Sequence, residues 1–209
     1  MKKFLIADDH FIVRAGLIFL IREEFMHAEI DECHDGDSVW KKIQASEYDL
    51  AILDIFMPFT DFLHLLKKIF SLRPDQKILI VTMSSECIYA KKYLSLSPSV
   101  KGFINKEADP SEIQKAIVNI LNNKGYLSPR MQDLLIQEAL TGKVQNPFEA
   151  LSIRELEIMN HLVCGKNVSE IAHILSVHSS TILAYKAKIM HKLGVSNIIE
   201  LSKMVQMFE

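Results

Sequence analysis

The chain has 209 residues, of which 49% are hydrophobic and 24% are charged, with a formal net charge of −2. This length is enough for two small domains, and the composition excludes a disordered or collagen-like chain. We expect a cytoplasmic protein with no membrane partner, because no apolar run approaches a membrane span and no signal peptide is recognisable. Cys33, Cys87 and Cys164 are widely spaced and indicate reduced thiols rather than a disulfide framework or a metal site.

The first 123 residues alternate short apolar runs with helical patterns. Four runs are nearly unbroken, at residues 4–7, 50–53, 78–81 and 100–105. Strands that are covered by helices on both faces have this pattern, so the runs predict a parallel sheet. We expect one further short strand at 29–33, and helices after Asp9 and near 37–46, 61–72, 85–96 and 110–123. The last of these helices begins with an N-cap and a proline at its first position, Asp109-Pro110.

Each of the four runs ends at residues suited to phosphoryl transfer. Asp8 and Asp9 follow the first run, Asp54 follows the second, Thr82 follows the third and Lys106 follows the fourth. Sites in parallel sheets form where the carboxyl ends of the strands meet, so we expect these side chains to lie together. Taken singly, each has an ordinary explanation, such as Asp9 capping the helix that follows it. The combination at four strand ends favours a site.

Three carboxylates at one edge of a sheet would repel one another unless a cation lies between them. Mg²⁺ prefers oxygen ligands, so we expect Asp8 and Asp9 to hold it. Asp54 would then present one oxygen to the ion and the other to a phosphorus atom. The Lys106 ammonium and the Thr82 hydroxyl would contact the phosphoryl oxygens, and the product would be an acyl phosphate on Asp54.

Residues 124–149 differ in character from the segments on either side. Ser128-Pro129 and Asn146-Pro147 interrupt the stretch, while Met131, Leu134 and Leu135 keep helical spacing. We interpret it as a linker that contains one amphipathic helix.

Residues 150–209 carry no strand pattern and predict an all-α domain. Ser152 with Glu155 is a capping box, and Asn167 with Glu170 repeats the arrangement. Gly165 and Gly194 follow expected helix ends. The predicted helices lie near 152–164, 168–175, 179–193 and 197–207. A short helix, a turn and a longer helix form the organisation of a helix-turn-helix.

The N-terminal half resembles the receiver domain of two-component response regulators. The resemblance is carried by segments 4–10, 53–58, 81–84 and 102–106, which hold Phe-Leu-Ile-Ala-Asp-Asp-His, Leu-Asp-Ile-Phe-Met-Pro, Val-Thr-Met-Ser and Gly-Phe-Ile-Asn-Lys. It implies a flavodoxin-like α/β domain over residues 1–123, with five parallel strands in the order 2-1-3-4-5. It also implies that Asp54 is the phosphoacceptor and that a sensor histidine kinase is the donor.

The same resemblance assigns roles to the remaining positions of the site. Asp8 and Asp9 would bind Mg²⁺ with the backbone carbonyl of Phe56. Thr82 and Lys106 would bind the phosphoryl group, and Phe103 would be the aromatic switch that turns inward when Thr82 moves. An aspartyl-phosphate phosphatase on a similar sheet is disfavoured, because such enzymes need an acid or base where Phe56 stands. We therefore expect a regulator rather than an enzyme.

Residues 150–209 resemble the LuxR-type helix-turn-helix domain. The matching segments are Leu-Ser-x-Arg-Glu at 151–155, residues 165–172, Ser-Ser-Thr-Ile at 179–182 and residues 189–195. The resemblance implies a homodimer on activation that binds double-stranded DNA, with helix 179–193 in the major groove. The DNA-facing positions would be Ser180, Thr181, Leu183, Ala184, Lys186, Ala187 and Lys188.

The charge of this domain supports DNA binding only locally. Six basic residues and six acidic residues lie between positions 148 and 209. We expect Lys186 and Lys188 to hold phosphates. Leu183, Ala184 and Ala187 stand where the family more often has polar residues, so direct hydrogen-bonded readout from them is not expected. The alternative is a phosphorylation-switched regulator whose C-terminal domain binds a protein partner.

Three further expectations concern packing. Phe59 and Phe62 replace the glycines that usually follow the phosphoacceptor. We expect them to pack partly inward, and the alternative is that they form an exposed patch for a partner. The C-terminal histidines, including His161, are expected to be solvated or partly packed. The surface that forms the activated dimer in the family carries Lys91, Lys92, Tyr93, Lys101 and Phe103 here, although the sequence alone is equally consistent with an ordinary mixed surface.

Overall fold

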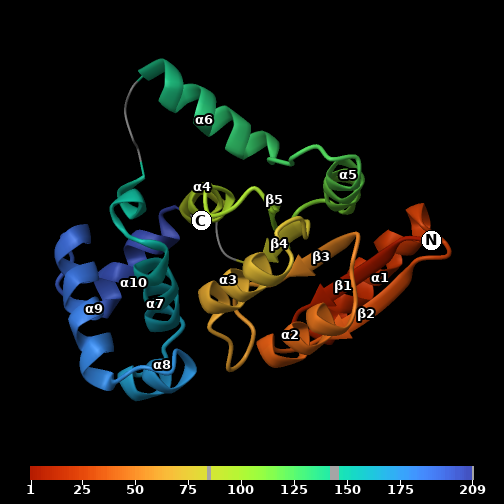
Figure 1. Cartoon of the computed structure of the whole chain (residues 1–209). Coiled ribbons are helices and arrows are strands. Elements are labelled where there is room, and N and C mark those ends of the chain that lie inside the picture. Colours follow the sequence, from red (N-terminus) through yellow and green to blue (C-terminus); the bar gives the residue numbers. More distant parts are fainter. Residues whose placement is uncertain (84–85, 142–145, 209) are drawn as a thin grey trace.

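The computed structural model describes residues 1–83, 86–141 and 146–208, and it consists of an α/β domain and a helical domain joined by a helix (Figure 1). Five parallel strands form the sheet in the order β2-β1-β3-β4-β5, which confirms the predicted order. The strands are β1 (Lys3–Ala7), β2 (Glu29–Cys33), β3 (Leu50–Leu53), β4 (Ile78–Thr82) and β5 (Val100–Asn105).

Helices cover both faces of this sheet, so alternate residues of each strand enter two different cores. Phe4 and Ile6 of β1 pack with α1 (Phe11–Glu24) and α5 (Pro110–Leu121). Leu5 and Ala7 belong to the core on the opposite face. That face is covered by α2 (Gly36–Ala45), α3 (Phe62–Leu72) and α4 (Glu86–Leu94). Burial on both faces explains why the strands are continuous apolar runs.

Two helix starts of the α/β domain bear on the sequence-based expectations, since one removes the alternative explanation of Asp9 as a helix cap and the other lacks an expected capping bond. The N-cap of α1 is His10, so Asp9 is not a helix cap. Asp109 precedes α5 without any side-chain capping bond, although Pro110 is the first helical residue as expected. Glu112 instead accepts a hydrogen bond of 2.9 Å from the Tyr126 hydroxyl, which ties α5 to the start of the linker.

The linker and the helical domain follow in chain order. Their elements are α6 (Pro129–Thr141), η1 (Pro147–Ala150), α7 (Ile153–Val163), α8 (Val168–Ile174), α9 (Ser179–Leu193) and α10 (Ile198–Gln206). The four helices predicted after residue 150 are present, and both capping boxes form. Gly194 ends α9 with φ +66° and Gly165 follows α7 with φ +81°. Residues 142–145 of the predicted linker lie outside the described residues.

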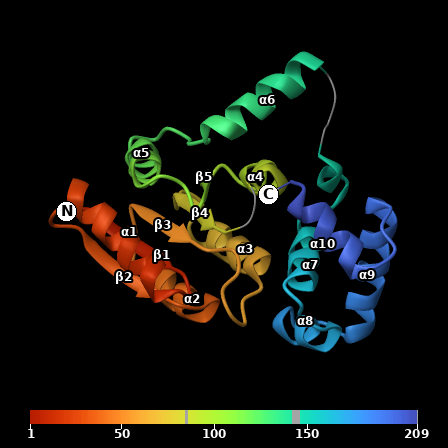
Figure 2. The same ribbon diagram turned by 180° about the vertical axis from the view of Figure 1, so that it is seen from behind.

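The two domains share one apolar core. The core under α2, α3 and α4 continues into the helical domain, where Leu156 and Ile158 of α7 are fully buried. Figures 1 and 2 show α7 beside α3 and α4, with α6 bridging the two halves. Within the surface expected to form the dimer, Tyr93 and Phe103 are buried, and Lys91 pairs with Glu138 of α6 and Glu149 of η1. Within the described part of the chain, no helix is long and apolar enough to cross a membrane.

Glu155 connects the start of α7 to the end of α9. Its carboxylate accepts hydrogen bonds of 2.6 Å from the Ser152 amide and 2.7 Å from the Lys192 ammonium. Burial alone would raise the pKa of Glu155, but Lys192 and Ser152 outweigh it and lower the pKa to about 2. The folded pKa therefore lies below the unfolded value, so this stabilisation is present above pH 4.5 and is lost as pH falls toward 2.

We predict that Glu155→Gln lowers the free energy of unfolding at pH 7 by about 2 kcal/mol. The difference from the wild type should shrink as pH falls from 4.5 toward 2, because the wild type loses the same interaction. Urea unfolding followed by circular dichroism at several pH values measures this difference. Glu170→Gln is the matched control, since Glu170 forms the same capping box on α8 without a lysine partner among the described ion pairs. A difference that stays constant with pH would contradict the assignment.

Candidate functional site

The expected phosphoryl-transfer residues meet at the carboxyl edge of the sheet. The parallel ladder continues past the strand ends, where the amide of Asp54 donates to Ala7 and the amide of Lys106 donates to Thr82, both over 2.9 Å. Register along the ladder therefore fixes these residues side by side. Asp8, Asp54 and Thr82 are each at most 4% exposed, and so is the side chain of Lys106.

A buried ion-pair network joins three of these residues. The Lys106 ammonium lies 2.6 Å from Asp8 Oδ2 and 2.9 Å from Asp54 Oδ2. Burial raises the pKa of Asp54 more than Lys106 lowers it. Burial opposes the charge of Lys106 as well, but Asp54 and Asp8 outweigh it and raise its pKa. The ammonium therefore stays charged and partly compensates two buried carboxylates.

One oxygen of Asp54 is left without compensation. Its Oδ1 atom is buried and has no hydrogen-bond partner, while Oδ2 is held by Lys106. A buried acceptor without a partner costs free energy, and such atoms mark places where a ligand or ion is expected. Asp54 thus presents one bound oxygen and one oxygen available for chemistry.

Asp9 and His10 extend the site toward solvent. The Nδ1 atom of His10 lies 2.8 Å from Asp9 Oδ1 and 3.3 Å from Asp8 Oδ1. Ligand atoms of Asp8, Asp9 and His10 lie within 4.8 Å of one another. Sequence reasoning did not single out His10, although its position directly after the two aspartates was the available signal.

The donor set fits a hard divalent cation such as Mg²⁺. Asp8, Asp9 and Asp54 offer three carboxylates, whereas Lys106 supplies one ammonium, so negative charge is in excess. Carboxylate oxygens are the ligands that Mg²⁺ prefers. The unpartnered Oδ1 of Asp54 adds an oxygen with no competing hydrogen bond.

The aromatic residue expected to switch is already inside the fold. Phe103 is 1% exposed, and its ring centroid lies 6.4 Å from that of Tyr93 in α4. Thr82, also buried, ends the neighbouring strand β4. The inward position of Phe103 therefore coexists here with α4 packed against α7.

The loop between β3 and α3 is shaped by two phenylalanines that behave differently. Phe62 is fully buried, whereas Phe59 is 79% exposed, so the expected partial packing of both residues is wrong. Phe59 adopts φ +51°, a backbone conformation that glycine tolerates and phenylalanine adopts at a cost. Its ring meets that of His173 on α8 edge-on at 6.5 Å. The exposed side chain of Phe59 thus reaches the helical domain.

The same loop carries a charged connection between the domains. Arg154 of α7 lies 2.9 Å from Asp61 Oδ2 and 2.7 Å from Glu157 Oε2. The amide of Phe62 donates to Glu157 Oε1 over 3.1 Å. Burial and the charge of Asp61 raise the pKa of Glu157 against the opposing effect of Arg154. The loop and α7 must therefore stay in contact for the buried charges of this network to remain paired.

Phe56 links the phosphoryl-transfer site to this interface. Its ring lies edge-on to Tyr89 of α4 at 6.1 Å and to His161 of α7 at 6.2 Å. His161 is 3% exposed, so the expectation of a solvated or partly packed histidine is wrong there. Burial, then Lys166 and Arg154, lower the pKa of His161 to about 4. His161 is therefore neutral at pH 7, which suits its position against an aromatic ring.

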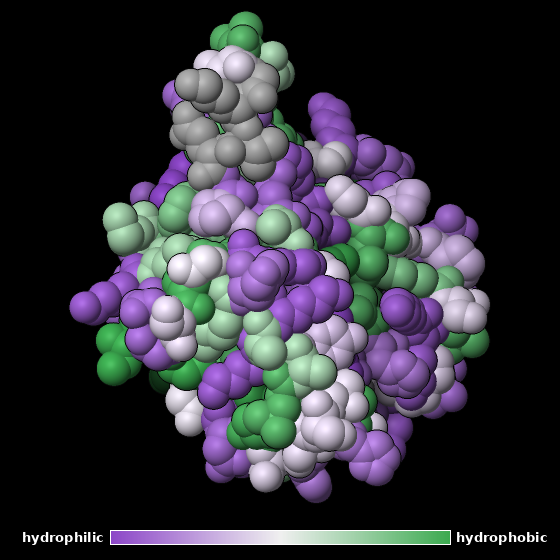
Figure 3. Space-filling model, turned by 90° about the vertical axis from the view of Figure 1, so that its left-hand side faces the viewer, coloured by the Kyte–Doolittle hydropathy of each residue, from purple (hydrophilic) through white to green (hydrophobic). Residues whose placement is uncertain are grey.

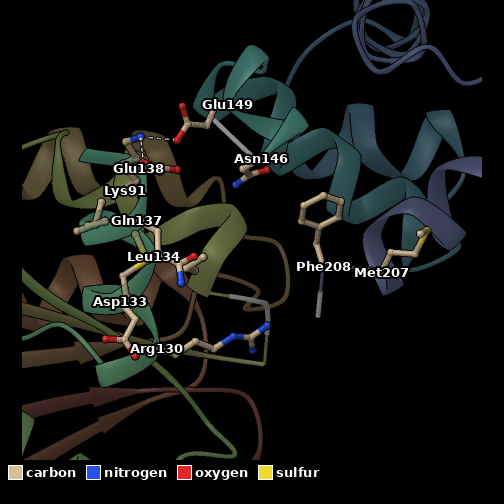
Figure 4. Close-up of a pocket in the computed structure, with 12 residues that line it drawn as sticks. Lys91, Arg130, Asp133, Leu134, Gln137, Glu138, Asn146, Glu149, Met207 and Phe208 are labelled. Atoms are coloured by element: carbon tan, nitrogen blue, oxygen red, sulfur yellow. Dashed lines mark hydrogen bonds and ion pairs between the residues drawn. The ribbon is translucent and has the colours of Figure 1, made fainter. Parts of the chain in front are cut away.

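The linker makes a second set of contacts, with α4. Lys91 pairs with Glu138 of α6 and with Glu149 of η1, and Lys92 donates to the carbonyl of Glu149 over 2.9 Å. A cavity of about 370 Å³ lies next to these ion pairs. Figure 4 shows Lys91 between the two glutamates, with Phe208 on the opposite side of the opening. Helix α6 is thus held to α4 by charge pairs that solvent can reach.

The outer face of α9 is open. Ile182, Ile189 and Leu193 of this helix are buried against the helical domain. Of the residues expected to face DNA, five are exposed and two are partly buried. The exposed ones are Ser180, Leu183, Ala184, Ala187 and Lys188, and the partly buried ones are Thr181 and Lys186. Figure 3 faces the helical side of the molecule and shows apolar and hydrophilic residues mixed over it.

Two models of known families match the chain. Residues 4–118 match "Response regulator receiver domain", and residues 149–205 match "Bacterial regulatory proteins, luxR family". Neither description is that of an enzyme.

Similar proteins match over nearly the whole chain. The oxygen regulatory protein NreC of Staphylococcus carnosus is 34% identical over 206 residues, which cover 95% of this chain and 94% of that protein. The response regulator UvrY of Escherichia coli K12 is 27% identical over 203 residues, covering 97% of this chain and 92% of UvrY. A structure of RcsB from Salmonella enterica serovar Typhimurium, bound to a promoter in the presence of the phosphomimetic BeF₃⁻, has a TM-score of 0.79 and 25% identity. It covers 98% of both chains.

We predict that Lys106→Met destabilises the protein at pH 7 by about 3 kcal/mol, because two buried carboxylates lose their shared cation. The loss should diminish at lower pH as Asp54 takes up a proton, and added Mg²⁺ should stabilise the variant more than the wild type. Thermal unfolding at several pH values measures the first effect. Thermal unfolding without Mg²⁺ and at Mg²⁺ concentrations on the order of 0.1 to 10 mM measures the second. Lys115→Met on the exposed side of α5 is the control. Equal Mg²⁺ responses in the variant and the wild type would contradict the assigned ion-pair network.

We predict that Asp61→Asn loosens the contact between the domains without unfolding either one. Asparagine retains the N-cap of α3, where Asp61 Oδ1 accepts from the His64 amide, but it removes the charge that pairs with Arg154. Hydrogen exchange should speed up at the Phe62 amide, which donates to Glu157 across the interface. Asp35→Asn, at the N-cap of α2, is the matched control. Unchanged exchange at Phe62 in Asp61→Asn would rule out a role for the ion pair in closing the interface.

Proposed function

This chain belongs to the response regulators that combine a receiver domain with a LuxR-family domain, and from that premise we propose how its phosphorylation controls binding to DNA. The protein is a DNA-binding transcriptional response regulator. The observation that carries the proposed switch is the loop from Asp54 to Phe62, which contacts the phosphoryl-transfer site at one end and the helical domain at the other.

Asp54 is the phosphoacceptor in this proposal. A free oxygen of Asp54 attacks the phosphorus of a phosphohistidine on a sensor histidine kinase. The P–O bond forms as the P–N bond breaks, and the released imidazole takes up a proton. The support for this role is the state of the carboxylate, because Oδ1 is unpartnered and Oδ2 is held by Lys106, so that one oxygen could face the cation while the other attacks the phosphorus.

The surrounding residues divide the remaining work. Asp8, Asp9, Asp54 and the Phe56 carbonyl would hold Mg²⁺, which supplies positive charge to the phosphoryl oxygens. Lys106 already lies within 2.9 Å of Asp54 and would pair with a phosphoryl oxygen instead of the carboxylate. The Thr82 hydroxyl would contact the phosphoryl group from β4. Phe103, whose ring centroid lies 6.4 Å from that of Tyr93, would couple the position of Thr82 to α4.

Phosphorylation would weaken the contact between the domains. Phe56 is two residues from Asp54, and its ring packs on His161 of α7. Any shift of this loop also moves Asp61 and Phe62, which hold Arg154 and Glu157. A free-energy difference of a few kcal/mol between the closed and open arrangements is enough for such a switch. The acyl phosphate on Asp54 would favour the open arrangement.

The open arrangement would allow dimerisation on DNA. The receiver domain contacts α7 and α8 and not the outer face of α9. The closed arrangement of the two domains would therefore hinder the pairing of two helical domains more than it hinders access of DNA to α9. A dimer would place two copies of α9 in successive major grooves. Lys186 and Lys188 would contact phosphates, with Ser180 and Thr181 beside them. Such a regulator works in the cytoplasm, where the chromosome lies.

The second candidate is a regulator whose helical domain binds a protein. One observation favours it, the apolar centre of the outer face of α9, where Leu183 is 55% exposed. The equal numbers of acidic and basic residues after position 148 point the same way. A DNA-binding measurement separates the two candidates directly.

We predict that the full-length protein enriches a few genomic DNA fragments only when beryllofluoride and Mg²⁺ are present. Asp54→Asn should abolish this dependence, because the acceptor oxygen is lost. Asp75→Asn, on an exposed loop, should behave as the wild type. Sequencing of captured fragments at fixed salt measures the enrichment. An absence of enriched DNA in both conditions would instead favour the protein-partner candidate.

A further inference from the structure

The open face of α9 has an unusual centre for a helix that enters the major groove. Leu183, Ala184 and Ala187 are exposed and lie together, since positions three and four apart share one side of a helix. None of these side chains has a hydrogen-bonding group. Bidentate hydrogen bonds to guanine or adenine are therefore impossible at these positions.

The polar groups of α9 lie around this apolar centre rather than within it. Ser180 precedes it at the helix start, and Lys188 follows it. Lys192 is occupied inside the domain, because its ammonium lies 2.7 Å from Glu155 and donates to the carbonyl of Ala150 over 2.9 Å. The Lys188 ammonium lies 3.6 Å from Glu155 Oε1, which is a looser contact than that of Lys192. Because its side chain is 62% exposed, Lys188 remains able to reach a phosphate. The arrangement combines a charged rim with an apolar middle.

The major groove offers one apolar group to such a surface. Each thymine carries a C5-methyl group there, whereas the other major-groove contacts are hydrogen-bond donors and acceptors. Two alanines allow the helix backbone to approach the bases closely, and the longer Leu183 side chain reaches beyond them. Size and polarity thus match methyl groups on the floor of the groove.

We infer that Leu183, Ala184 and Ala187 select DNA by packing against thymine methyl groups, with specificity coming from apolar contact rather than from hydrogen bonds to bases. This inference rests on the proposed DNA binding and defines its sequence preference. Removing one buried methyl group should weaken binding about fourfold, as expected for one methylene-sized apolar contact.

The test begins with selection from a pool of randomised DNA duplexes by the full-length protein with beryllofluoride and Mg²⁺. The enriched site is then synthesised with thymine or with deoxyuridine, which lacks only the methyl group, at each thymine in turn. We expect about a fourfold loss of affinity at one or more positions in each half-site. The ratio of thymine to uracil affinity is the readout.

Two variants assign the effect to α9. Leu183→Ala should bring the affinity ratio close to one at the position that Leu183 contacts, because the shortened side chain no longer reaches the methyl group. Lys188→Ala should weaken binding to thymine and uracil duplexes equally and leave the ratio unchanged. Circular dichroism verifies that both variants remain folded.

The outcomes distinguish a failure of the thymine-methyl inference from a failure of the proposed DNA binding. Enrichment of a site that contains no thymine, or in which uracil binds as well as thymine, overturns the methyl inference and leaves DNA binding intact. A thymine preference that persists unchanged in Leu183→Ala, Ala184→Gly and Ala187→Gly also overturns it. Failure to enrich any sequence overturns the proposed DNA binding and, with it, this inference.

Discussion

The fold depends on one constraint, which is that Asp54 must remain buried at the end of β3 while the loop that follows it contacts a second domain. The parallel ladder holds the Asp54 backbone through its bond to Ala7, and Lys106 holds one of its oxygens. A few residues later, the Phe62 amide bonds to Glu157 of α7. A change of charge at Asp54 therefore acts on a segment that is fixed at both ends.

The two ends of this segment use different physics. The cluster around Asp54 holds three carboxylates with too little positive charge, so an added cation would stabilise it. The interface is apolar and aromatic around Phe56 and His161, with one buried charge network through Arg154. Breaking such a network leaves unpaired buried charges, which costs several kcal/mol. This combination suits the proposed switch, because a local change of charge at Asp54 would favour one of two domain arrangements over the other.

The packing also separates control from recognition. The receiver domain occupies α7 and α8, and the linker helix α6 is pinned to α4 through Lys91. The outer face of α9 stays exposed. In the proposed mechanism, regulation and base contact would therefore involve different surfaces of the helical domain, so substitutions at Asp61 and at Leu183 should affect different properties of the protein.

The sequence by itself determined where the strands and helices lie and that Asp8, Asp54, Thr82 and Lys106 gather, because strand ends and capping patterns are local features that a parallel sheet converts into a site. The strand order was implied by the resemblance to receiver domains, and the tertiary structure confirms it. It did not determine the contact between the domains. Arg154, Asp61 and Glu157 are ordinary charged residues in the sequence, and only their tertiary meeting buries them together. The different burial of Phe59 and Phe62 likewise depends on tertiary packing, since Phe62 enters the core shared by the two domains and Phe59 contacts His173. Local patterns fix what forms along the chain, whereas contacts between residues distant in sequence depend on how the two domains pack.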